Sequence, residues 1–482
     1  MKWLARVALG LVVFAIVLVG WLYLLVAPPA PLAIPPQGAT LDGVTVIEPG
    51  RSRVEGRRVV VAGGAIESVD AARGDANPWA GMFVTPGLVD MHVHFPPATL
   101  AGQTELFAFL YLDHGVTSVR DAGDAEGNAT EPARQGVAAG RFPGPRIRAC
   151  GMFVDGEPPT WKNTILARNP EEGRRAVDLV VDSGYECVKA YNELDAPTLA
   201  AIRDEAHARG VPVIGHVPRR IPYEEARLDD AQHLIGIPPP PADPSLRFPA
   251  LLVQWEKLDD ARLDHLIAES KRLGIASTPT LVTVERLTHM RDYERMKAEP
   301  DALLLPAFYR NVVWNPAGGI SGAGQLDAAG FAMVDRAFAA MKRTVKRMHD
   351  EGVRLHSGTD TLVAFVVPGA ALHRELRIYV DAGLTPEEAL AISMRDSAAD
   401  LGVPGLGEIR AGAPADLLVL REDPTRSLAA LDTIAAVIRD GRLYTRAALD
   451  DELARYRAHF DSRLFDGIVT PIVRRVLANA RK

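Results

Sequence analysis

The chain has 482 residues, of which 48% are hydrophobic and 24% are charged, as in globular proteins with one large domain and a smaller one. Its formal net charge of −7 disfavours nonspecific binding to nucleic acids, which requires a basic face. The sequence also lacks a basic stripe interleaved with aromatic residues. We therefore expect no nucleic-acid partner.

An apolar segment opens the chain. Residues 7–27 are uncharged and almost wholly apolar, and about 20 helical residues span a bilayer core of roughly 30 Å. Lys2 and Arg6 precede this stretch, and the next basic residue is Arg51. This asymmetry predicts a cytoplasmic N-terminus and a main domain outside, in the periplasm if the organism is Gram-negative. A cleaved signal peptide is the alternative, but the apolar core is long for one, so we expect residues 1–27 to be a transmembrane anchor.

Composition and periodicity divide the rest of the chain into four parts. Residues 28–42 form a proline-rich spacer. Short β-like runs fill residues 43–84 and return in residues 405–446, which predicts a small β-sandwich built from both chain ends. In residues 85–404 between them, short apolar runs alternate with helical patterns, as in parallel βα units. Residues 447–482 are charged and amphipathic, and we expect them to pack outside as a helical tail.

Eight candidate strands lie within residues 85–404. They end near His94, Asp121, Gly151, Tyr191, Val217, Gly236, Val282 and Asp360. Eight βα units predict a (β/α)8 TIM barrel, an α/β fold whose active site lies at the carboxyl ends of the strands. A doubly wound sheet is the alternative, but this chain lacks the glycine-rich phosphate loop that would follow its first strand.

Cysteine is rare, because only Cys150 and Cys187 occur. In an exported chain the two could pair, but two cysteines do not make a disulfide framework. We expect two buried, unpaired thiols near neighbouring strands.

Metal-binding side chains gather at the predicted strand ends. His92 and His94 end the first strand, and residues i and i+2 of a strand point to the same face. Both imidazoles can therefore reach one metal ion. Four later strand ends supply further candidates: Lys189, His216, His233 and Asp360. Burying all these groups unpaired would cost on the order of several kcal/mol, so a shared metal site is the better explanation.

Five segments together resemble the motifs of the metal-dependent amidohydrolase superfamily. Three look like its first, second and eighth strand motifs and two like its closing segments: residues 86–94 (PGLVDMHVH), 115–123 (GVTSVRDAG), 357–360 (SGTD), 383–390 (GLTPEEAL) and 412–417 (GAPADL). The resemblance covers residues 43–443 and is closest to the branch of imidazolonepropionase-like proteins and Xaa-Pro dipeptidases. It implies a metal-dependent hydrolase that cleaves an amide-type C–N bond.

The resemblance also implies two divalent metal ions, which we expect to be zinc, and a role for each candidate ligand. The implied set is His92, His94 and Asp360 on the more buried ion, His216 and His233 on the second, and a carboxylated Lys189 bridging both. Burial favours the neutral amine of a lysine, which can react with CO2. The alternative for Lys189 is a salt bridge to a neighbouring carboxylate.

In the implied mechanism, a hydroxide that bridges the two metals attacks the scissile carbonyl, and Asp360 acts as general acid and base toward the leaving amine. The implied substrate is a small molecule such as a dipeptide, an N-acyl amino acid or a cyclic amide. Tyr191 follows Lys189 by two residues and shares its strand face, so it either binds the substrate or packs there.

Two other features of the strand ends bear on the site. Gln232 stands before the sixth-strand histidine, where members of the superfamily often carry Glu, and this leaves the choice of substrate open. Arg120 and Asp121 are expected to form a structural ion pair at the end of the second strand.

Two alternatives to the hydrolase remain. A mononuclear, deaminase-like enzyme would keep the barrel, but single-metal members of the superfamily do not need Lys189. A non-catalytic, membrane-anchored binding protein on a barrel scaffold would be expected to have lost a ligand, and all six candidates are present.

Overall fold

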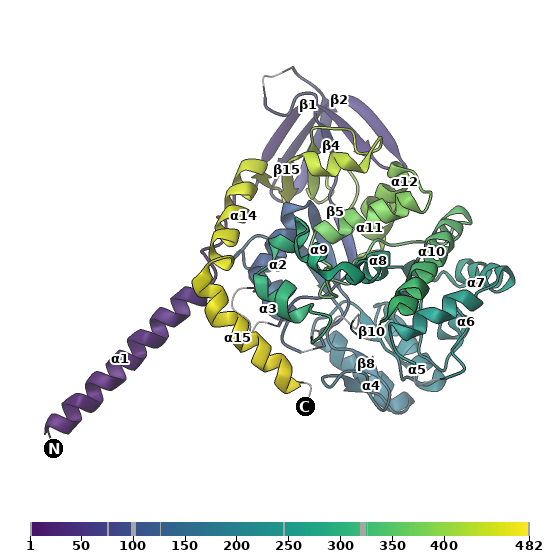
Figure 1. The fold of residues 1–482 in the computed structure, drawn as a ribbon. Coiled ribbons are helices and arrows are strands. Elements are labelled where there is room, and N and C mark those ends of the chain that lie inside the picture. The colour runs from purple at the N-terminus through teal and green to yellow at the C-terminus, as the bar shows by residue number, and fades with distance from the viewer. Residues whose placement is uncertain are drawn as a thin grey trace.

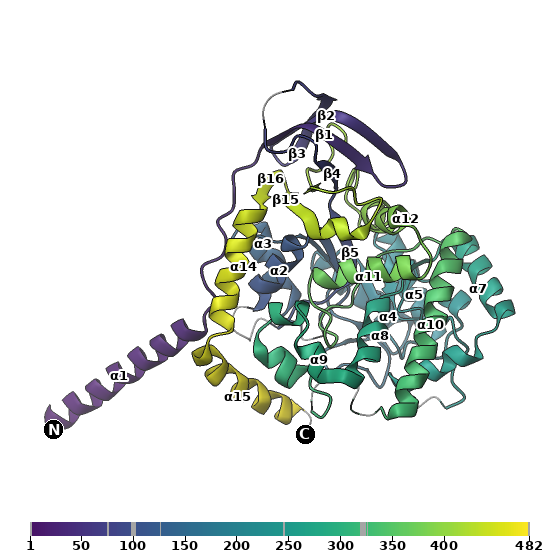
Figure 2. The same ribbon diagram turned by 45° about the horizontal axis from the view of Figure 1, so that its top comes forward.

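The computed structural model describes residues 2–74, 77–97, 103–125, 127–243, 246–318, 324 and 326–480. Its three parts are a projecting N-terminal helix, a mixed sheet at one end, and a large α/β body (Figure 1). A view turned by 45° shows the same sheet capping the body and the same helix standing free (Figure 2).

The N-terminal helix α1 (Lys2–Val26) contains the predicted apolar segment as far as Val26. Residues Arg6–Leu24 have a hydropathy of 2.7 and bury nothing inside the protein, so the helix is long and apolar enough to cross a bilayer. Its far end lies well away from the body in both views (Figures 1 and 2).

Both chain ends contribute strands to one sheet, in the order β16-β15-β14-β4-β1-β2-β3. These strands are β1 (Ala39–Glu48), β2 (Ser52–Ala62), β3 (Ala65–Ala71), β4 (Phe83–Pro86), β14 (Leu417–Leu420), β15 (Ile434–Arg439) and β16 (Arg442–Thr445). β4 joins the two ends, since it pairs parallel with β1 and antiparallel with β14. This sheet has a hydrophobic core separate from that of the body, and Leu41, Val59 and Ile438 are among its residues. A division of this sheet into a two-layer sandwich stays a prediction.

The body contains short parallel strands in two further sheets, β5-β6-β7 and β13-β12-β11-β10-β8-β9. Their bounds are β5 (Leu88–Val93), β6 (Val116–Asp121), β7 (Arg146–Ala149), β8 (Val154–Asp155), β9 (Ile165–Leu166), β10 (Val188–Ala190), β11 (Val213–Gly215), β12 (Asp230–Gln232) and β13 (Ala276–Thr278). Leu355 forms a parallel bridge with Ser277, and Ser357 O accepts a hydrogen bond from Met91 N at 2.8 Å. The chain that leads to Asp360 thus lies between β13 and β5. The fold is an α/β fold of the TIM-barrel type, and full barrel closure stays a prediction.

Helices follow most strands and cover the outside of the body (Figure 1). In chain order the α-helices are α2 (Gln103–Asp113), α3 (Thr130–Ala138), α4 (Pro170–Asp182), α5 (Ala196–Ala208), α6 (Tyr223–Ala226), α7 (Asp260–Leu273), α8 (Leu281–His289), α9 (Tyr293–Lys297), α10 (Ala328–Asp350), α11 (Ala370–Asp381), α12 (Pro386–Ala391), α13 (Ser397–Asp400), α14 (Arg446–Phe460) and α15 (Arg463–Ala480). The 3-10 and π segments are η1 (Ala250–Lys257), η2 (Met290–Asp292), η3 (Asp301–Leu304), η4 (Tyr309–Val313), η6 (Ile392–Asp396) and η7 (Leu428–Thr433).

Local sequence explains where several helices begin. The Asn169 and Asp195 side chains cap α4 and α5, and each helix starts with a proline in its first turn. Thr385 and Glu388 form a reciprocal capping box at the start of α12.

The prediction for the seventh strand is wrong in its end point. This strand, β13, ends at Thr278, and Val282 lies in α8. Thr280 adopts a left-handed conformation (φ 49°), which breaks the extended chain, and the carboxylate of buried Glu375 accepts hydrogen bonds from Leu281 N and Val282 N at 2.9 and 2.6 Å. A short apolar run suits a buried helix as well as a strand, so periodicity could not separate them.

The prediction of two unpaired thiols is also wrong, because Cys150 and Cys187 form a disulfide bond. Cys150 follows β7 and Cys187 precedes β10. Glu186 N donates a hydrogen bond to Ala149 O at 2.9 Å, and this contact brings the two cysteines side by side with their Cα atoms 4.4 Å apart.

Candidate metal centre

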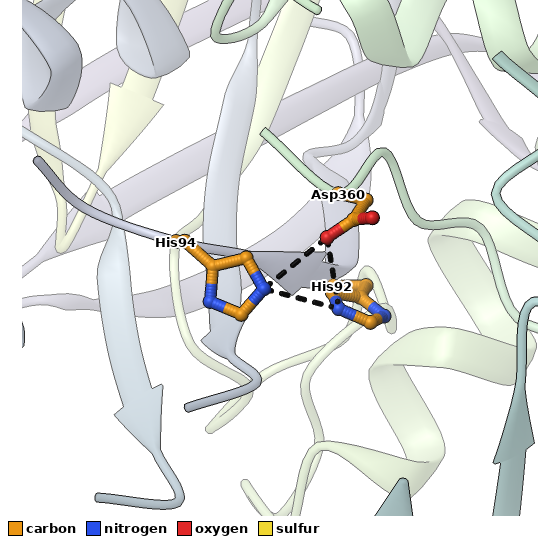
Figure 3. A group of neighbouring side chains, drawn as sticks. All are labelled: His92, His94 and Asp360. Carbon is orange, nitrogen blue, oxygen red and sulfur yellow. Dashed lines mark hydrogen bonds and ion pairs between the residues drawn. The ribbon is translucent and has the colours of Figure 1, made fainter. Parts of the chain in front are cut away.

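Three side chains converge at the carboxyl end of β5. His92 Nε2 and His94 Nε2 lie 3.3 and 3.2 Å from Asp360 Oδ1, and 3.3 Å from each other (Figure 3). Asp360 is brought to the histidines by its backbone, whose N–H donates to His92 O at 2.7 Å. Two nitrogens and one oxygen thus face a common point, as predicted from the His-x-His spacing and the eighth-strand motif.

His216 and His233 lie next to this trio. The His233 ring centroid is 4.6 Å from that of His92 and 4.9 Å from that of His216. His233 Nδ1 is 4.0 Å from Asp360 Oδ2. Among the described residues, only the His92, His94 and Asp360 side chains form a compact group of ligand atoms, all within 4.8 Å of one another. His216 and His233 extend this group from β11 and β12.

Hydrogen bonds made by the Nδ1 atoms orient three of the four imidazoles. His94 Nδ1 lies 2.6 Å from Gly123 O, His216 Nδ1 lies 2.9 Å from Asn192 Oδ1, and His233 Nδ1 lies 2.6 Å from Thr280 Oγ1. Metal-binding histidines commonly use their second nitrogen in this way, which fixes the ring and leaves Nε2 for the ion.

Lys189 lies in β10 and is almost completely buried, with 1% of its surface exposed. Burial lowers the pKa of its amine from 10.5 to about 7. Its Nζ donates a short hydrogen bond to Oε1 of Gln232. In the described part of the chain, no carboxylate oxygen lies within 4.0 Å of the Lys189 amine. The alternative, a direct salt bridge between Lys189 and a neighbouring carboxylate, is therefore not formed. Gln232 stands where members of the superfamily often carry Glu, so an uncharged amide rather than a carboxylate lies beside Lys189.

The charge states of His92 and Asp360 suit a divalent metal ion. Burial lowers the pKa of His92 well below its usual value, so its imidazole is neutral. Burial alone would raise the pKa of Asp360, but His92 and His233 hold it well below the ordinary value, so the carboxylate is ionised. Burial alone would lower the pKa of His94, but the carboxylates of Asp360 and Asp121 raise it above its usual value, so this imidazole must lose its proton when a metal binds. Neutral imidazole and carboxylate are the forms that bind zinc and similar ions, so this donor set fits the predicted metal.

Tyr191 forms part of an aromatic wall beside the site. Its ring stacks on His216 and Phe153, with centroids 4.2 and 4.7 Å away, and its hydroxyl accepts a hydrogen bond from Trp161 Nε1 at 3.1 Å. Trp161 is 46% exposed, so the wall runs from the candidate metal ligands to the surface. Phe153 and Trp161 were missed in the sequence, where single aromatic residues in loops carry no signal.

A buried carboxylate missed by the sequence analysis joins β5 to the Asp360 segment. Asp90 accepts hydrogen bonds from His92 N at 3.2 Å and from Thr359 N and Oγ1 at 3.1 and 2.7 Å. These three bonds position the backbone on both sides of the trio. Burial nonetheless raises the pKa of Asp90 to about 7.

The predicted ion pair between Arg120 and Asp121 is wrong. Arg120 instead forms a short ion pair with Asp230, while Asp121 accepts from Thr130 Oγ1 at 2.7 Å. Adjacent residues of a strand point to opposite faces, so two neighbours in β6 cannot pair with each other. Arg120 Nε also donates to Met91 O at 2.9 Å, directly before His92, so the pair supports the strand that carries the site.

Comparisons with known proteins agree with this architecture. The family model described as "Amidohydrolase family" matches residues 83–236 and 326–444, more than half of the chain. Among solved structures, a bottromycin amidohydrolase aligns with a TM-score of 0.69 at 23% identity, covering 92% of this chain and 93% of its own. A Xaa-Pro dipeptidase with methionine bound in its active site aligns with a TM-score of 0.62 at 18% identity, covering 85% and 100%. A putative prolidase from Bifidobacterium longum aligns with a TM-score of 0.62 at 25% identity, covering 88% and 99%. A sequence search of curated proteins finds no match.

Proposed function

The chain belongs to the amidohydrolase family, whose members are enzymes that hydrolyse carbon–nitrogen bonds, and we propose that it is a two-metal hydrolase of a dipeptide or related amide. The observation that carries this proposal is the approach of His92, His94 and Asp360 to within 3.3 Å of one another beside a buried lysine. Residues 85–404 form the proposed catalytic unit.

The proposed ligand assignment follows the side chains that line the site. His92, His94 and Asp360 would hold one ion, and His216 and His233 would hold the other. The neutral amine of Lys189 would add to CO2, forming an N–C bond and losing one proton, and the resulting carbamate would serve as a further ligand. Bound metal ions supply Lewis-acid polarisation of the scissile carbonyl and a more acidic water nucleophile.

Within this site the chain's own residues orient groups and move protons. The Asp360 carboxylate is ionised at neutral pH, so it can accept a proton from water at Oδ2 and return it to the leaving amine nitrogen. Tyr191, Phe153 and Trp161 form the wall against which the apolar part of the substrate lies. This wall excludes water from one side of the reacting amide.

For the substrate, we favour a dipeptide with a C-terminal proline, since neighbours in structure carry the names Xaa-Pro dipeptidase and prolidase. The test is metal content per chain, measured with bicarbonate present, together with hydrolysis of Met-Pro and of N-acyl amino acids. Two ions, with loss of one or both in Lys189→Ala, support the proposal. One ion with release of ammonia from an amino-substituted ring supports the deaminase-like alternative. No ion after addition of zinc or manganese supports the binding protein.

We further propose that α1 is an uncleaved anchor and that the enzyme lies outside the cytoplasm. The Cys150–Cys187 disulfide supports this location, since disulfides persist in oxidising compartments. Intact-mass analysis of the membrane fraction tests it, because a cleaved signal would remove residues 1–27.

A further inference from the structure

We propose that α15 is a membrane-surface helix whose outer face rests on anionic lipid beside α1. The inference rests on the proposed anchoring by α1 and extends it from a tether to a defined orientation of the enzyme on the membrane.

Two apolar stripes run along α15, each with a spacing of four residues. The inner stripe packs on the body and consists of Phe465, Val469, Val473 and Leu477. The outer stripe is shifted by one residue and consists of Leu464, Ile468, Ile472 and Val476. Leu464, Ile472 and Val476 are 59%, 53% and 55% exposed, so packing within the chain does not account for this second stripe.

Such exposure is uncommon elsewhere in the protein. Outside α1, the described part of the chain has only four other large hydrophobic side chains that are exposed: Val54, Trp161, Leu179 and Phe248. These four lie on separate elements or loops, whereas α15 collects three on one face. The outer stripe is therefore a continuous apolar surface rather than scattered exposure.

Basic residues accompany the outer stripe. Arg463, Arg474 and Arg475 are exposed, and none of them forms an ion pair with another residue that the structure describes. The one acidic residue of the helix, Asp466, accepts a hydrogen bond from Thr470 Oγ1 at 2.5 Å. An apolar face flanked by arginines is typical of helices that lie in the interface of an anionic membrane.

The position of α15 brings this face to the lipid. Residues of α15 contact α1, and the chain that leaves α1 is held by α14, where Glu452 Oε1 accepts a hydrogen bond from Leu32 N at 2.9 Å. In both views α15 begins beside the inner end of α1 and runs away from it in a different direction, along the edge of the body from which α1 projects (Figures 1 and 2). A bilayer around α1 would therefore meet α15, and the arginines match its anionic headgroups.

Site-specific labels on the full-length protein in lipid nanodiscs test the proposal. The only two cysteines are disulfide-bonded, so one introduced cysteine can be labelled selectively. Ile472→Cys reports on α15 and Leu11→Cys on α1. Val54→Cys is the control, since it is 43% exposed on β2, at the end of the molecule away from α1 (Figure 1).

With an environment-sensitive dye, we expect blue-shifted emission and protection from aqueous iodide at positions 472 and 11, but not at 54. Replacing anionic by zwitterionic lipid should reduce the protection at 472. Arg474→Gln and Arg475→Gln should each lower the ratio of protected to exposed label by about fivefold, the ratio that corresponds to the loss of one basic residue at an anionic surface.

An exposed label at 472 together with a protected label at 11 would overturn the proposal while leaving the anchor intact. An exposed label at 11 would overturn the anchor and this inference with it. Protection at 472 that increases with protein concentration and needs no anionic lipid would identify a second copy of the chain as the occupant, and would also overturn the proposal.

Discussion

Replacing Lys189 by methionine should change how the stability of the metal-free protein depends on pH. Lys189 is buried, and its pKa falls from 10.5 to about 7 because burial penalises the ammonium form. Since the folded pKa lies below the unfolded one, the unfolded chain binds more protons at neutral pH. The free energy of unfolding of the wild type therefore increases as the pH rises from 7 towards 10.5. Methionine does not titrate and removes this contribution.

The pKa shift sets the size of the effect. One pKa unit corresponds to about 1.4 kcal/mol, so the shift of Lys189 corresponds to about 5 kcal/mol in full. Of this, the wild type should regain roughly 2 kcal/mol between about pH 7 and pH 9. Methionine also leaves Gln232 Oε1 without its donor, at a cost of about 1–3 kcal/mol that does not depend on pH. The free energy of unfolding of the variant relative to the wild type should thus fall by roughly 2 kcal/mol across this range.

The assay is denaturant unfolding of the chelated, full-length protein in mild detergent and CO2-free buffer at several pH values. Lys257→Met removes an exposed lysine and is the matched control. Parallel stability curves for Lys189→Met and the wild type would refute the argument, because they would show that Lys189 carries its charge in the folded state. With bicarbonate and zinc present, the wild type should be more stable than Lys189→Met, since only the wild type can form the proposed bridge.

Three further outcomes follow from the structure. Asp360→Asn should lower kcat/KM for the cleaved dipeptide by roughly a thousandfold with an unchanged circular dichroism spectrum, and full activity would remove Asp360 from the mechanism. Replacing both Cys150 and Cys187 by Ser should lower the free energy of unfolding by about 4 kcal/mol, because the bond closes a 37-residue separation. Reduction of the wild-type disulfide should lower the free energy of unfolding by the same amount, and a smaller loss would show that the serine side chains cause part of the effect. Arg120→Met should destabilise the fold by about 3–5 kcal/mol by leaving Asp230 buried without its partner. Adding Asp230→Asn to that variant should recover part of the loss in thermal unfolding, and a purely additive double variant would contradict the pairing.

Local sequence patterns were sufficient to predict much of the candidate site. The two-residue period of a strand placed His92 and His94 on one face, and the eighth-strand motif supplied Asp360. The apolar length of residues 7–27 likewise predicted a helix that can cross a membrane. These features depend on neighbouring residues alone, so they can be read without knowing the packing.

Contacts between distant segments were decided only by the tertiary structure. The partner of Arg120 lies 110 residues away at Asp230. Cys150 meets Cys187 because the end of β7 lies beside the segment that precedes β10. The aromatic wall next to His216 comes from loops, whose conformation no periodicity describes. Short segments of the sequence are thus sufficient to identify the residues that can bind a metal. Their exposure, charge state and partners depend on which strands pack side by side, because burial and distance are properties of the folded molecule.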